Sequence, residues 1–558
     1  MRSRQFNYRS TLIIIFLLLG LASILWRLID LSVINRHFLL EQSDARILRT
    51  IDMPAHRGMV MDRVNSVLAL STPVYSVWID PREFHPTAAQ LRVLSRLLQM
   101  PVDTIRTRSR LHKGFVYLKR QNPPDVMAVI KKLDINGLHF QKEYQRFYPE
   151  GEVMAQVLGI TNVDDRGQEG VELAYNQWLS GLVGKRQVLK DRLGNVISEL
   201  ALLKQPQEGR DLTLSIDHRI QYIAYRALKE QVQKYHAVMG SVVVLNPNTG
   251  EIIAMANQPS YNPNNRTLRM NADVRRNRAL TDAYEPGSSM KPFTIAVALE
   301  SGKYTPDSVV NTHPGYMRVG GFDIKDDFHD NGIINLQKIL EVSSNIGAAK
   351  ILLSLEPNSL WNLLKRFGFG EPSDSGFPGE SGGKLIEHPV WYQSDIATLA
   401  YGYGISVTTL QLAQAYAVLA NLGVRNPTTF LKMNKAPAGK RVLSEKVARE
   451  VNLMLENVVS AGTGRRAKVD GYSVAGKTGT AYLAGPGGYD KKKYISDFAG
   501  FAPAVHPQLV IAVLIREPQG KHFGAEVAAP VFSTVMAESL RILNVSPDKM
   551  TQERQNFS

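Results

Sequence analysis

The chain has 558 residues, 44% of them hydrophobic and 21% charged, which gives room for about three folded units and excludes both a disordered chain and a polytopic membrane protein. It has no cysteine, which excludes disulfides, thiolate metal sites and a cysteine nucleophile and agrees with a location outside the cytoplasm. Lys and Arg outnumber Asp and Glu by 66 to 51, which favours anionic neighbours, but no zinc-finger spacing or RNP-like aromatic cluster accompanies them, so we expect no nucleic-acid partner.

The N-terminal part predicts a membrane anchor. The run from Thr11 to Trp26 carries no charge, and with its continuation to Ile34 it has the roughly 20 residues that a bilayer core requires. We therefore expect a single spanning helix over residues 11–34. The alternative is a cleaved signal peptide, but a cut at Gly20-Leu21-Ala22 would fall inside the apolar run instead of after it.

The charges around this segment indicate its orientation. Three arginines, Arg2, Arg4 and Arg9, precede it, and the first acidic residue is Asp30. The positive-inside tendency then places residues 1–10 in the cytoplasm and everything after the anchor outside, in the periplasm, so that the chain is a single-pass protein of the cytoplasmic (inner) membrane. Arg27 lies one helical turn before Asp30, so the two side chains either form an ion pair near the far interface or each extend to it separately.

The next part predicts an elongated, non-catalytic pedestal of α+β structure. Residues 35–50 form a short stalk, and residues 51–205 form the pedestal, a domain of the dimerisation type. The hydrophobic pattern of the pedestal predicts a strand at 67–70 and helices over 88–98, 124–133 and within 167–175. A polar stretch from Lys204 to Arg210, with Pro206 and Gly209, marks the domain boundary.

Residues 210–545 predict a second, larger α+β domain, and residues 546–558 a C-terminal tail. Its signals are a helix over 220–235, strands over 241–245 and 251–256, a buried strand over 509–515 and a closing helix over 531–543. The turn residues Asn246-Pro247-Asn248-Thr249-Gly250 join the first two strands as a hairpin. We therefore expect an antiparallel sheet with many helices around it.

The larger domain contains a Ser-x-x-Lys motif in Glu285-Pro286-Gly287-Ser288-Ser289-Met290-Lys291, which leads into an apolar helix over 293–299. Lys291 stacks its ammonium group one turn along the same helix face as Ser288, within reach of the hydroxyl group. A serine becomes a nucleophile when a neighbour accepts its proton, and a lysine does this where burial and nearby positive charge lower its pKa. Alone, the motif fits any serine that caps a helix.

A second motif is Val342-Ser343-Ser344-Asn345, which follows a predicted helix over 336–340. Ser343 is suited to relay a proton, and Asn345 is suited to donate a hydrogen bond to a substrate carbonyl group. Read alone, this segment is an ordinary polar turn.

A third motif is Lys477-Thr478-Gly479-Thr480. Lys477 and the two threonines are suited to hold a substrate carboxylate. Gly479 has no side chain and so lets a peptide backbone approach and add to a strand edge. Read alone, the segment is a loop between strands.

The three motifs in this order resemble the signature of penicillin-binding proteins and class A β-lactamases. From Pro54 to about Leu543 the chain resembles the class B, high-molecular-mass penicillin-binding proteins, and among them the division-specific peptidoglycan D,D-transpeptidases of the FtsI type. The likeness includes Arg57-Gly58-Met59, Asp62-Arg63, Asn248–Glu251, Pro259–Asn264, Arg276–Arg278 and Tyr401–Gly404. The chain departs from the family at Val64-Asn65-Ser66, where a Ser/Asn-Gly turn is usual, which leaves the tightness of this turn open.

The resemblance implies a transpeptidase domain with a five-stranded antiparallel sheet between helices, as in β-lactamases. Ser288 would attack the D-Ala-D-Ala bond of a peptidoglycan stem peptide, release the terminal D-alanine and hold an acyl-enzyme until an amine of a neighbouring peptide accepts the acyl group. β-Lactam antibiotics would acylate the same serine. The resemblance implies no cofactor and no metal ion.

The same resemblance assigns roles within the site. Lys291 would act in proton transfer, and Ser343 and Asn345 would line the cleft. The backbone amides of Ser288 and Thr480 would form the oxyanion hole. The residues that would align the substrate are Lys477, Thr478, Gly479 and Thr480.

The resemblance also implies protein partners. Between Ile34 and Arg57 there is no room for a glycosyltransferase domain. Glycan polymerisation would then come from a membrane-embedded polymerase, which this protein would contact, with other division proteins, through its anchor and pedestal.

Several other functions share some of these features. An elongation-specific class B transpeptidase differs only in linking segments. A β-lactamase or D,D-carboxypeptidase would pass the acyl group to water, but it needs no pedestal, and no clear Glu-x-x-x-Asn element lies between the second and third motifs. A β-lactam sensor needs a cytoplasmic signalling part, and few residues precede the anchor; a pure scaffold role in division is compatible with catalysis.

Overall fold

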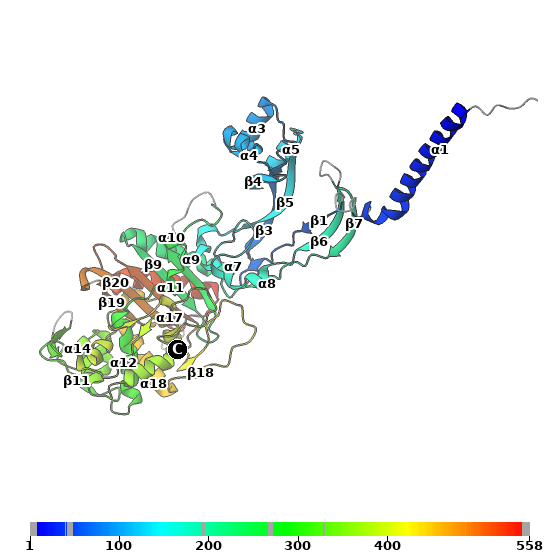
Figure 1. Ribbon diagram of the computed structural model, residues 1–558. Coiled ribbons are helices and arrows are strands. Elements are labelled where there is room, and N and C mark those ends of the chain that lie inside the picture. Colours follow the sequence, from blue (N-terminus) through cyan, green and yellow to red (C-terminus); the bar gives the residue numbers. More distant parts are fainter. Residues whose placement is uncertain are drawn as a thin grey trace, which may run out of the picture. The chain divides into compact units, whose positions relative to one another are not determined.

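The computed structural model describes residues 8–39, 41, 48–190, 196–265, 272–326, 330–485 and 487–549 (Figure 1). The chain divides into two compact units that are interleaved along the sequence. Unit 1 consists of the chain up to Arg57, Pro73–Tyr144 and Ser180–Gly209. Unit 2 consists of Gly58–Thr72, Gln145–Leu179 and the chain from Arg210 onward. The predicted pedestal therefore contributes residues to both units.

Unit 1 begins with the apolar helix α1 (Tyr8–Ile29), which continues as a π-helical turn over Asp30–Ile34. Together they make 27 residues that are long and apolar enough to cross a membrane, and none of the helix is buried in the protein. Of the two arrangements open to Arg27 and Asp30, the structure has the ion pair, with Arg27 Nη1 2.6 Å from Asp30 Oδ2. The predicted anchor is therefore one continuous helical segment.

The rest of unit 1 has two small β layers. One is an antiparallel sheet in the order β1 (Leu48–Met53), β6 (Gly184–Lys190) and β7 (Val196–Lys204). In the other, the end of β3 (Val67–Ile79) pairs with β4 (Val116–Asn122) and with β5 (Leu138–Phe147). Three helices close a core on this layer: α3 (Ala88–Leu98), α4 (Val102–Ser109) and α5 (Pro124–Lys131).

The N-terminal segments of unit 2 contain short elements. The strand β2 (Val60–Met61) pairs with the start of β3 and, in parallel, with β8 (Leu212–Thr213). Two short helices, α7 (Gly170–Ala174) and α8 (Asn176–Leu179), follow later. Apolar residues of these N-terminal segments of unit 2, such as Tyr148 and Val171, belong to the same hydrophobic core as residues of the larger domain.

The larger domain is built on a five-stranded antiparallel sheet, as expected. Its order is β10-β9-β21-β20-β19, so β19 is an edge strand. The strands are β9 (Met239–Leu245), β10 (Ile252–Gln258), β19 (Ala475–Gly485), β20 (Gly488–Ala502) and β21 (Leu509–Arg516). The predicted hairpin and the predicted buried strand are thus confirmed, with bounds that differ by one or two residues.

Both faces of this sheet are covered because its central strands are apolar on both sides. Val242 and Val244 of β9 pack with α9 (His218–Lys234) and the closing helix α20 (Ala529–Ile542). Val243 and Leu245 join the core on the other face, which includes α12 (Lys291–Glu300) and α17 (Thr409–Ala420). Continuous apolar strands of this kind are typical of a sheet between two helical layers. The fold class predicted from the sequence is confirmed.

Further helices pack in the same hydrophobic core as α12. Phe293 of α12 meets the rings of Phe367 and Tyr416 edge to face, at centroid distances of 5.2 and 5.8 Å. The helices of this group are α13 (Leu336–Glu341), α14 (Asn345–Leu353), α15 (Ser359–Phe367), α16 (Gln393–Leu399) and α18 (Glu445–Ser460).

Candidate active site

Ser288 lies in the turn that leads into α12. This turn, Gly287–Met290, is a 3-10 helix, and the α-helix begins directly after it at Lys291. Side chains three residues apart eclipse one another in a 3-10 turn. Ser288 and Lys291 therefore point to the same side, and Lys291 Nζ lies 3.0 Å from Ser288 Oγ. The Lys291 side chain is fully buried, so its amine is held at this place.

The second motif forms the corner between α13 and α14. Ser343 adopts a left-handed backbone conformation with φ of 59°, which is uncommon for a residue other than glycine. Asn345 begins α14. Lys291 Nζ donates to the Ser343 carbonyl oxygen and lies 2.8 Å from Asn345 Oδ1. The corner therefore surrounds the Lys291 amine with acceptors.

The third motif lies at the start of the edge strand β19. Lys477 is fully buried, and its Nζ donates to the Thr478 carbonyl oxygen at 3.1 Å. Thr480 Oγ1 accepts a hydrogen bond from the Gly524 amide at 3.0 Å, which ties the strand to the helix α19 (Gly524–Val527). The sequence predicted that Gly479 lets a peptide approach a strand edge, and the third motif does lie in the edge strand of the sheet.

The three motifs meet at the hydroxyl group of Ser343. Its Oγ lies 3.2 Å from Lys291 Nζ and 3.0 Å from Lys477 Nζ. A chain of polar atoms thus runs from Ser288 Oγ through one lysine and this hydroxyl group to the second lysine. Such a chain can take a proton from Ser288 and return one to a leaving group.

Glycines let the Ser288 turn pack directly on its neighbours. Gly287 has φ of +59°, and a Cβ on it would lie 2.9 Å from the Thr480 carbonyl oxygen. A Cβ on Gly402 would lie 2.1 Å from the Gly287 carbonyl oxygen. A side chain at either position would displace the turn that carries Ser288.

Glu285 and two tyrosines surround the loop that leads to Ser288. Glu285 Oε1 accepts hydrogen bonds from the Gly404 amide at 3.0 Å and from the Tyr489 hydroxyl group at 3.1 Å. Burial raises the pKa of the Glu285 carboxyl group. Burial also raises the pKa of Tyr403 to about 12, so this phenol stays neutral. The segment Tyr401–Gly404, which the sequence marked only by likeness, thus supports the loop before Ser288.

Asp326 holds the second motif in place, and no sequence motif pointed to it. Its Oδ2 accepts from the Ser344 hydroxyl group at 2.6 Å, and its Oδ1 accepts from the amides of Asn345 and Ile346 at 2.7 and 3.0 Å. A carboxylate at a helix N-terminus satisfies free amides and faces the positive end of the helix dipole. No spacing pattern singles out this aspartate, because it lies 18 to 20 residues before the residues of the second motif that it holds.

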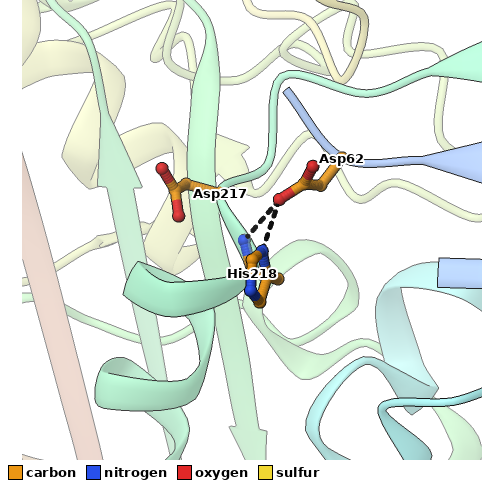
Figure 2. A group of neighbouring side chains, drawn as sticks. All are labelled: Asp62, Asp217 and His218. Carbon is orange, nitrogen blue, oxygen red and sulfur yellow. Dashed lines mark hydrogen bonds and ion pairs between the residues drawn. The ribbon is translucent and has the colours of Figure 1, made fainter. Parts of the chain in front are cut away.

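Asp62, Asp217 and His218 form another polar cluster, which Figure 2 shows at the start of α9. Asp62 Oδ2 lies 2.6 Å from His218 Nδ1, and Asp62 Oδ1 accepts the Val64 and Ser66 amides at 2.9 and 2.7 Å. The Asp217 carboxylate accepts hydrogen bonds from Nε and Nη2 of Arg219, at 2.9 and 2.7 Å. Donors already surround both carboxylates, so the cluster acts as a helix cap. The turn after Asp62 is tight, and Asn65 provides its positive φ of 67°.

This fold, with its buried lysines around a serine, defines the class of acyl-serine penicillin-binding enzymes. The family model described as "Penicillin binding protein transpeptidase domain" matches residues 240–537, and the "Penicillin-binding Protein dimerisation domain" matches residues 52–214. The chain is 42% identical to the probable peptidoglycan D,D-transpeptidase PbpC of Pseudomonas aeruginosa, over 99% of this chain and 98% of that protein. It is 40% identical to the peptidoglycan D,D-transpeptidase FtsI of Escherichia coli, over 99% of this chain and 94% of that protein.

Solved structures agree with these matches. The transpeptidase domain of penicillin-binding protein 3 from Burkholderia pseudomallei is 43% identical and superposes with a TM-score of 0.55, over 60% of this chain and 97% of that one. Penicillin-binding protein 3 of Mycobacterium tuberculosis, solved with aztreonam, is 26% identical with a TM-score of 0.70, over 89% of this chain and 98% of that one. This chain belongs to the penicillin-binding protein family, among the peptidoglycan D,D-transpeptidases of the FtsI type.

Proposed function

We propose that this protein cross-links septal peptidoglycan during cell division, as a membrane-anchored D,D-transpeptidase that β-lactams inhibit. One observation supports this most directly: the Ser343 hydroxyl group lies between the Lys291 and Lys477 amines, and Lys291 reaches Ser288. A serine with a buried amine beside it is an activated nucleophile. The whole-length similarity to FtsI supports the division role.

In the acylation step, Ser288 Oγ attacks the carbonyl carbon of the penultimate D-alanine of a stem peptide. The Ser288 proton passes to Lys291, and a proton returns, with Ser343 as relay, to the nitrogen of the leaving D-alanine. The peptide bond breaks and an ester forms. The amides of Ser288 and Thr480 would stabilise the negative charge that develops on the carbonyl oxygen.

In the second step, the amine of another stem peptide attacks the ester carbonyl carbon. The amine loses its proton to Lys291, the ester bond breaks, and Ser288 regains a proton. Asn345 would bind a substrate carbonyl group in the cleft. Lys477, Thr478 and Thr480 would bind the terminal carboxylate, and the free edge of β19 would pair with the peptide backbone.

The test is to treat the detergent-solubilised full chain with a penicillin and measure its intact mass and the modified peptide. We expect one acyl group on the peptide that contains Ser288, slow release of that group, and no modification of the S288A variant. S301A, at the exposed end of α12, serves as the matched serine control and should be acylated normally. A native protein that stays unmodified at Ser288 would refute the proposal.

A second assay separates transfer from hydrolysis. A D-Ala-D-Ala peptide and an excess of an amine acceptor, such as a D-amino acid, are given to the native protein. A transpeptidase forms the exchanged peptide in proportion to the acceptor. Hydrolysis alone, or rapid turnover of penicillin, would instead indicate a carboxypeptidase or a β-lactamase.

The membrane topology, the domain boundaries and the partners are part of the same proposal. The arginines before α1 support a cytoplasmic N-terminus and a periplasmic transpeptidase domain. Residues 51–205 would be the pedestal and residues 210–545 the transpeptidase domain. A membrane-embedded glycan polymerase and other division proteins would contact the anchor and the pedestal.

A further inference from the structure

Asp497 is a buried carboxyl group directly beside the third motif. It lies in β20 opposite Gly479 of β19, and it is 1% exposed. Residues directly opposite in an antiparallel pair point to the same face, and so do residues two apart in a strand. Asp497 therefore lies on the same sheet face as Lys477, which precedes Gly479 by two residues.

The carboxyl group occupies the space that Gly479 leaves by having no side chain. A Cβ on Gly479 would lie 2.3 Å from Asp497 Oδ1 and 2.5 Å from the Pro286 carbonyl oxygen. Asp497 is thus enclosed between the third motif and the residue that precedes the Ser288 turn. Neither of its oxygens has a hydrogen bond of regular geometry from the residues that the structure describes.

These surroundings disfavour a carboxylate ion. An ionised carboxyl group is costly to bury where it has no well-formed hydrogen bonds. Burial raises the pKa of Asp497 to about 8, although the Ser289 hydroxyl group, the Lys477 ammonium group and the Gly479 amide lower it in part. The geometry points in the same direction, since the acid is fully enclosed and neither oxygen has a hydrogen bond of regular geometry among the described residues.

The other titratable groups around Asp497 are tyrosines. Tyr284 precedes the Ser288 turn, and Tyr416 of α17 donates its hydroxyl proton to the Ser289 carbonyl oxygen at 2.8 Å. Burial raises the pKa of both phenols, and Asp497 raises them further where it is ionised. Both are therefore neutral, and Lys477 is the cation that acts on Asp497 among the described residues.

We propose that un-ionised Asp497 is a positioning residue for the transpeptidase reaction, which keeps the charge of Lys477 available for the terminal carboxylate of the substrate. An ionised Asp497 would neutralise Lys477 and repel an anionic substrate at close range, where interactions are weakly screened. This inference rests on the proposed function of Lys477. It adds a pH limit that comes from a residue outside the three motifs.

The experiment compares the native protein with D497N, a neutral isostere, and measures the second-order rate constant of acylation by a penicillin between pH 7 and 9. Penicillin carries a carboxylate, so it probes the same contact. With a pKa of about 8, we expect the ratio of the D497N rate to the native rate to rise by about tenfold across this range. The ratio cancels the titration of groups that the two proteins share, such as Lys291.

D490N is the matched control, because Asp490 lies in the same strand but is exposed. Its rate relative to the native protein should not change with pH. A flat ratio for D497N would overturn the inference while Ser288 is still acylated, so this failure is distinct from a failure of the proposed function. D497S provides a second neutral variant with a smaller side chain, and it should show the same rise.

Unfolding provides an independent readout. Folded Asp497 keeps its proton to about pH 8, whereas the unfolded group has a pKa of 3.8. The folded state therefore binds more protons in this window, and the free energy of unfolding falls as the pH rises from about 4 to about 8. Urea unfolding should show a smaller fall in D497N than in the native protein. An equal fall in both proteins would contradict the inference.

Discussion

Ser343 has a larger part in the site than a polar turn residue usually has. Its hydroxyl group lies between two buried amines, at 3.2 Å from Lys291 Nζ and 3.0 Å from Lys477 Nζ. Its backbone adopts φ of 59°, which costs free energy for a serine and persists because the helices on both sides hold it. Strain of this kind is found where the geometry of a single side chain matters for the chemistry.

At Gly479, one added carbon should reduce acylation strongly while reducing the stability of the fold only modestly. In G479A the new Cβ would collide with Asp497 Oδ1 and the Pro286 carbonyl oxygen, at 2.3 and 2.5 Å. We expect a loss of about 1–3 kcal/mol in unfolding free energy and a fall of about 100-fold in acylation, because the Ser288 turn moves relative to β19. Urea unfolding and penicillin acylation measure both effects.

G485A is the control for this substitution. Gly485 lies in the same strand, and the nearest atom to its new Cβ would be 3.9 Å away. This variant should keep both stability and acylation. Wild-type acylation in G479A would show that Pro286 and Asp497 yield without moving the nucleophile.

Helix ends, more than helix lengths, place the catalytic groups. The 3-10 turn before α12 aligns Ser288 with Lys291, and the corner between α13 and α14 brings Ser343 and Asn345 to the same amine. Asp326 fixes this corner from outside both helices. The second motif is therefore a capped helix start as well as a set of reactive side chains.

Removing the Asp326 carboxylate should loosen the second motif. D326A leaves the Ser344 hydroxyl group and two helix amides without their acceptor. We expect a loss of about 1–2 kcal/mol in unfolding free energy and a fall of about tenfold or more in acylation, since Asn345 and Ser343 lose their positions. Stopped-flow acylation and urea unfolding are the measurements.

S444A separates these two effects. Ser444 caps α18 by accepting from the Val447 amide at 3.3 Å, at a helix start that carries none of the motif residues. It should lose stability as other cap variants do but keep its acylation rate. If both variants lose acylation equally, Asp326 has only a general structural role.

At the scale of the whole molecule, two segments of unit 1, Pro73–Tyr144 and Ser180–Gly209, are insertions in the sequence of unit 2. At each insertion the chain leaves unit 2 and returns to it at neighbouring residues. The Thr72 hydroxyl group donates to the Gln145 carbonyl oxygen at 3.1 Å, on either side of one insertion. The Arg210 amide donates to the Trp178 carbonyl oxygen at 3.1 Å, at the other. Residues 58–72 and 145–179 bury apolar side chains, among them Leu68 and Leu158, in the core of the transpeptidase domain.

Two deletions test this interleaving. Replacing residues 73–144 with a short Gly-Ser linker keeps all of unit 2, so we expect its melting temperature to stay within a few degrees of the native value. A chain that starts at Arg210 lacks both buried segments. Because each large apolar side chain contributes about 1.5–3 kcal/mol on burial, its melting temperature should fall by on the order of 10 °C. Equal melting temperatures would show that the two segments add no stability.

The lack of cysteine makes the membrane topology directly testable. Single cysteines can be introduced by Ser3→Cys, before the anchor, and by Ser301→Cys, at an exposed position of the transpeptidase domain. In intact spheroplasts, a membrane-impermeant maleimide should label S301C and not S3C. The reverse labelling, or the release of a shorter soluble chain, would contradict an uncleaved anchor with a cytoplasmic N-terminus.

The sequence by itself determined the apolar N-terminal helix, the α+β class, the hairpin β9-β10 and the three motifs. Each of these depends on residues that are near one another in the chain: an uncharged apolar run, a two-residue alternation, a turn sequence, a serine three residues before a lysine. Features that depend only on neighbouring residues can be predicted from the sequence without the tertiary structure.

Only the tertiary structure decided which distant residues meet. Asp326 caps α14 and Asp497 fills the space beside Gly479, yet neither lies in a motif, because their partners are set by the packing of separate elements. The same is true of the Ser343 hydroxyl group, which reaches Lys477 across 134 residues. Periodicity records which face of an element is buried, but which atoms share that buried space depends on how the sheet and its helices pack.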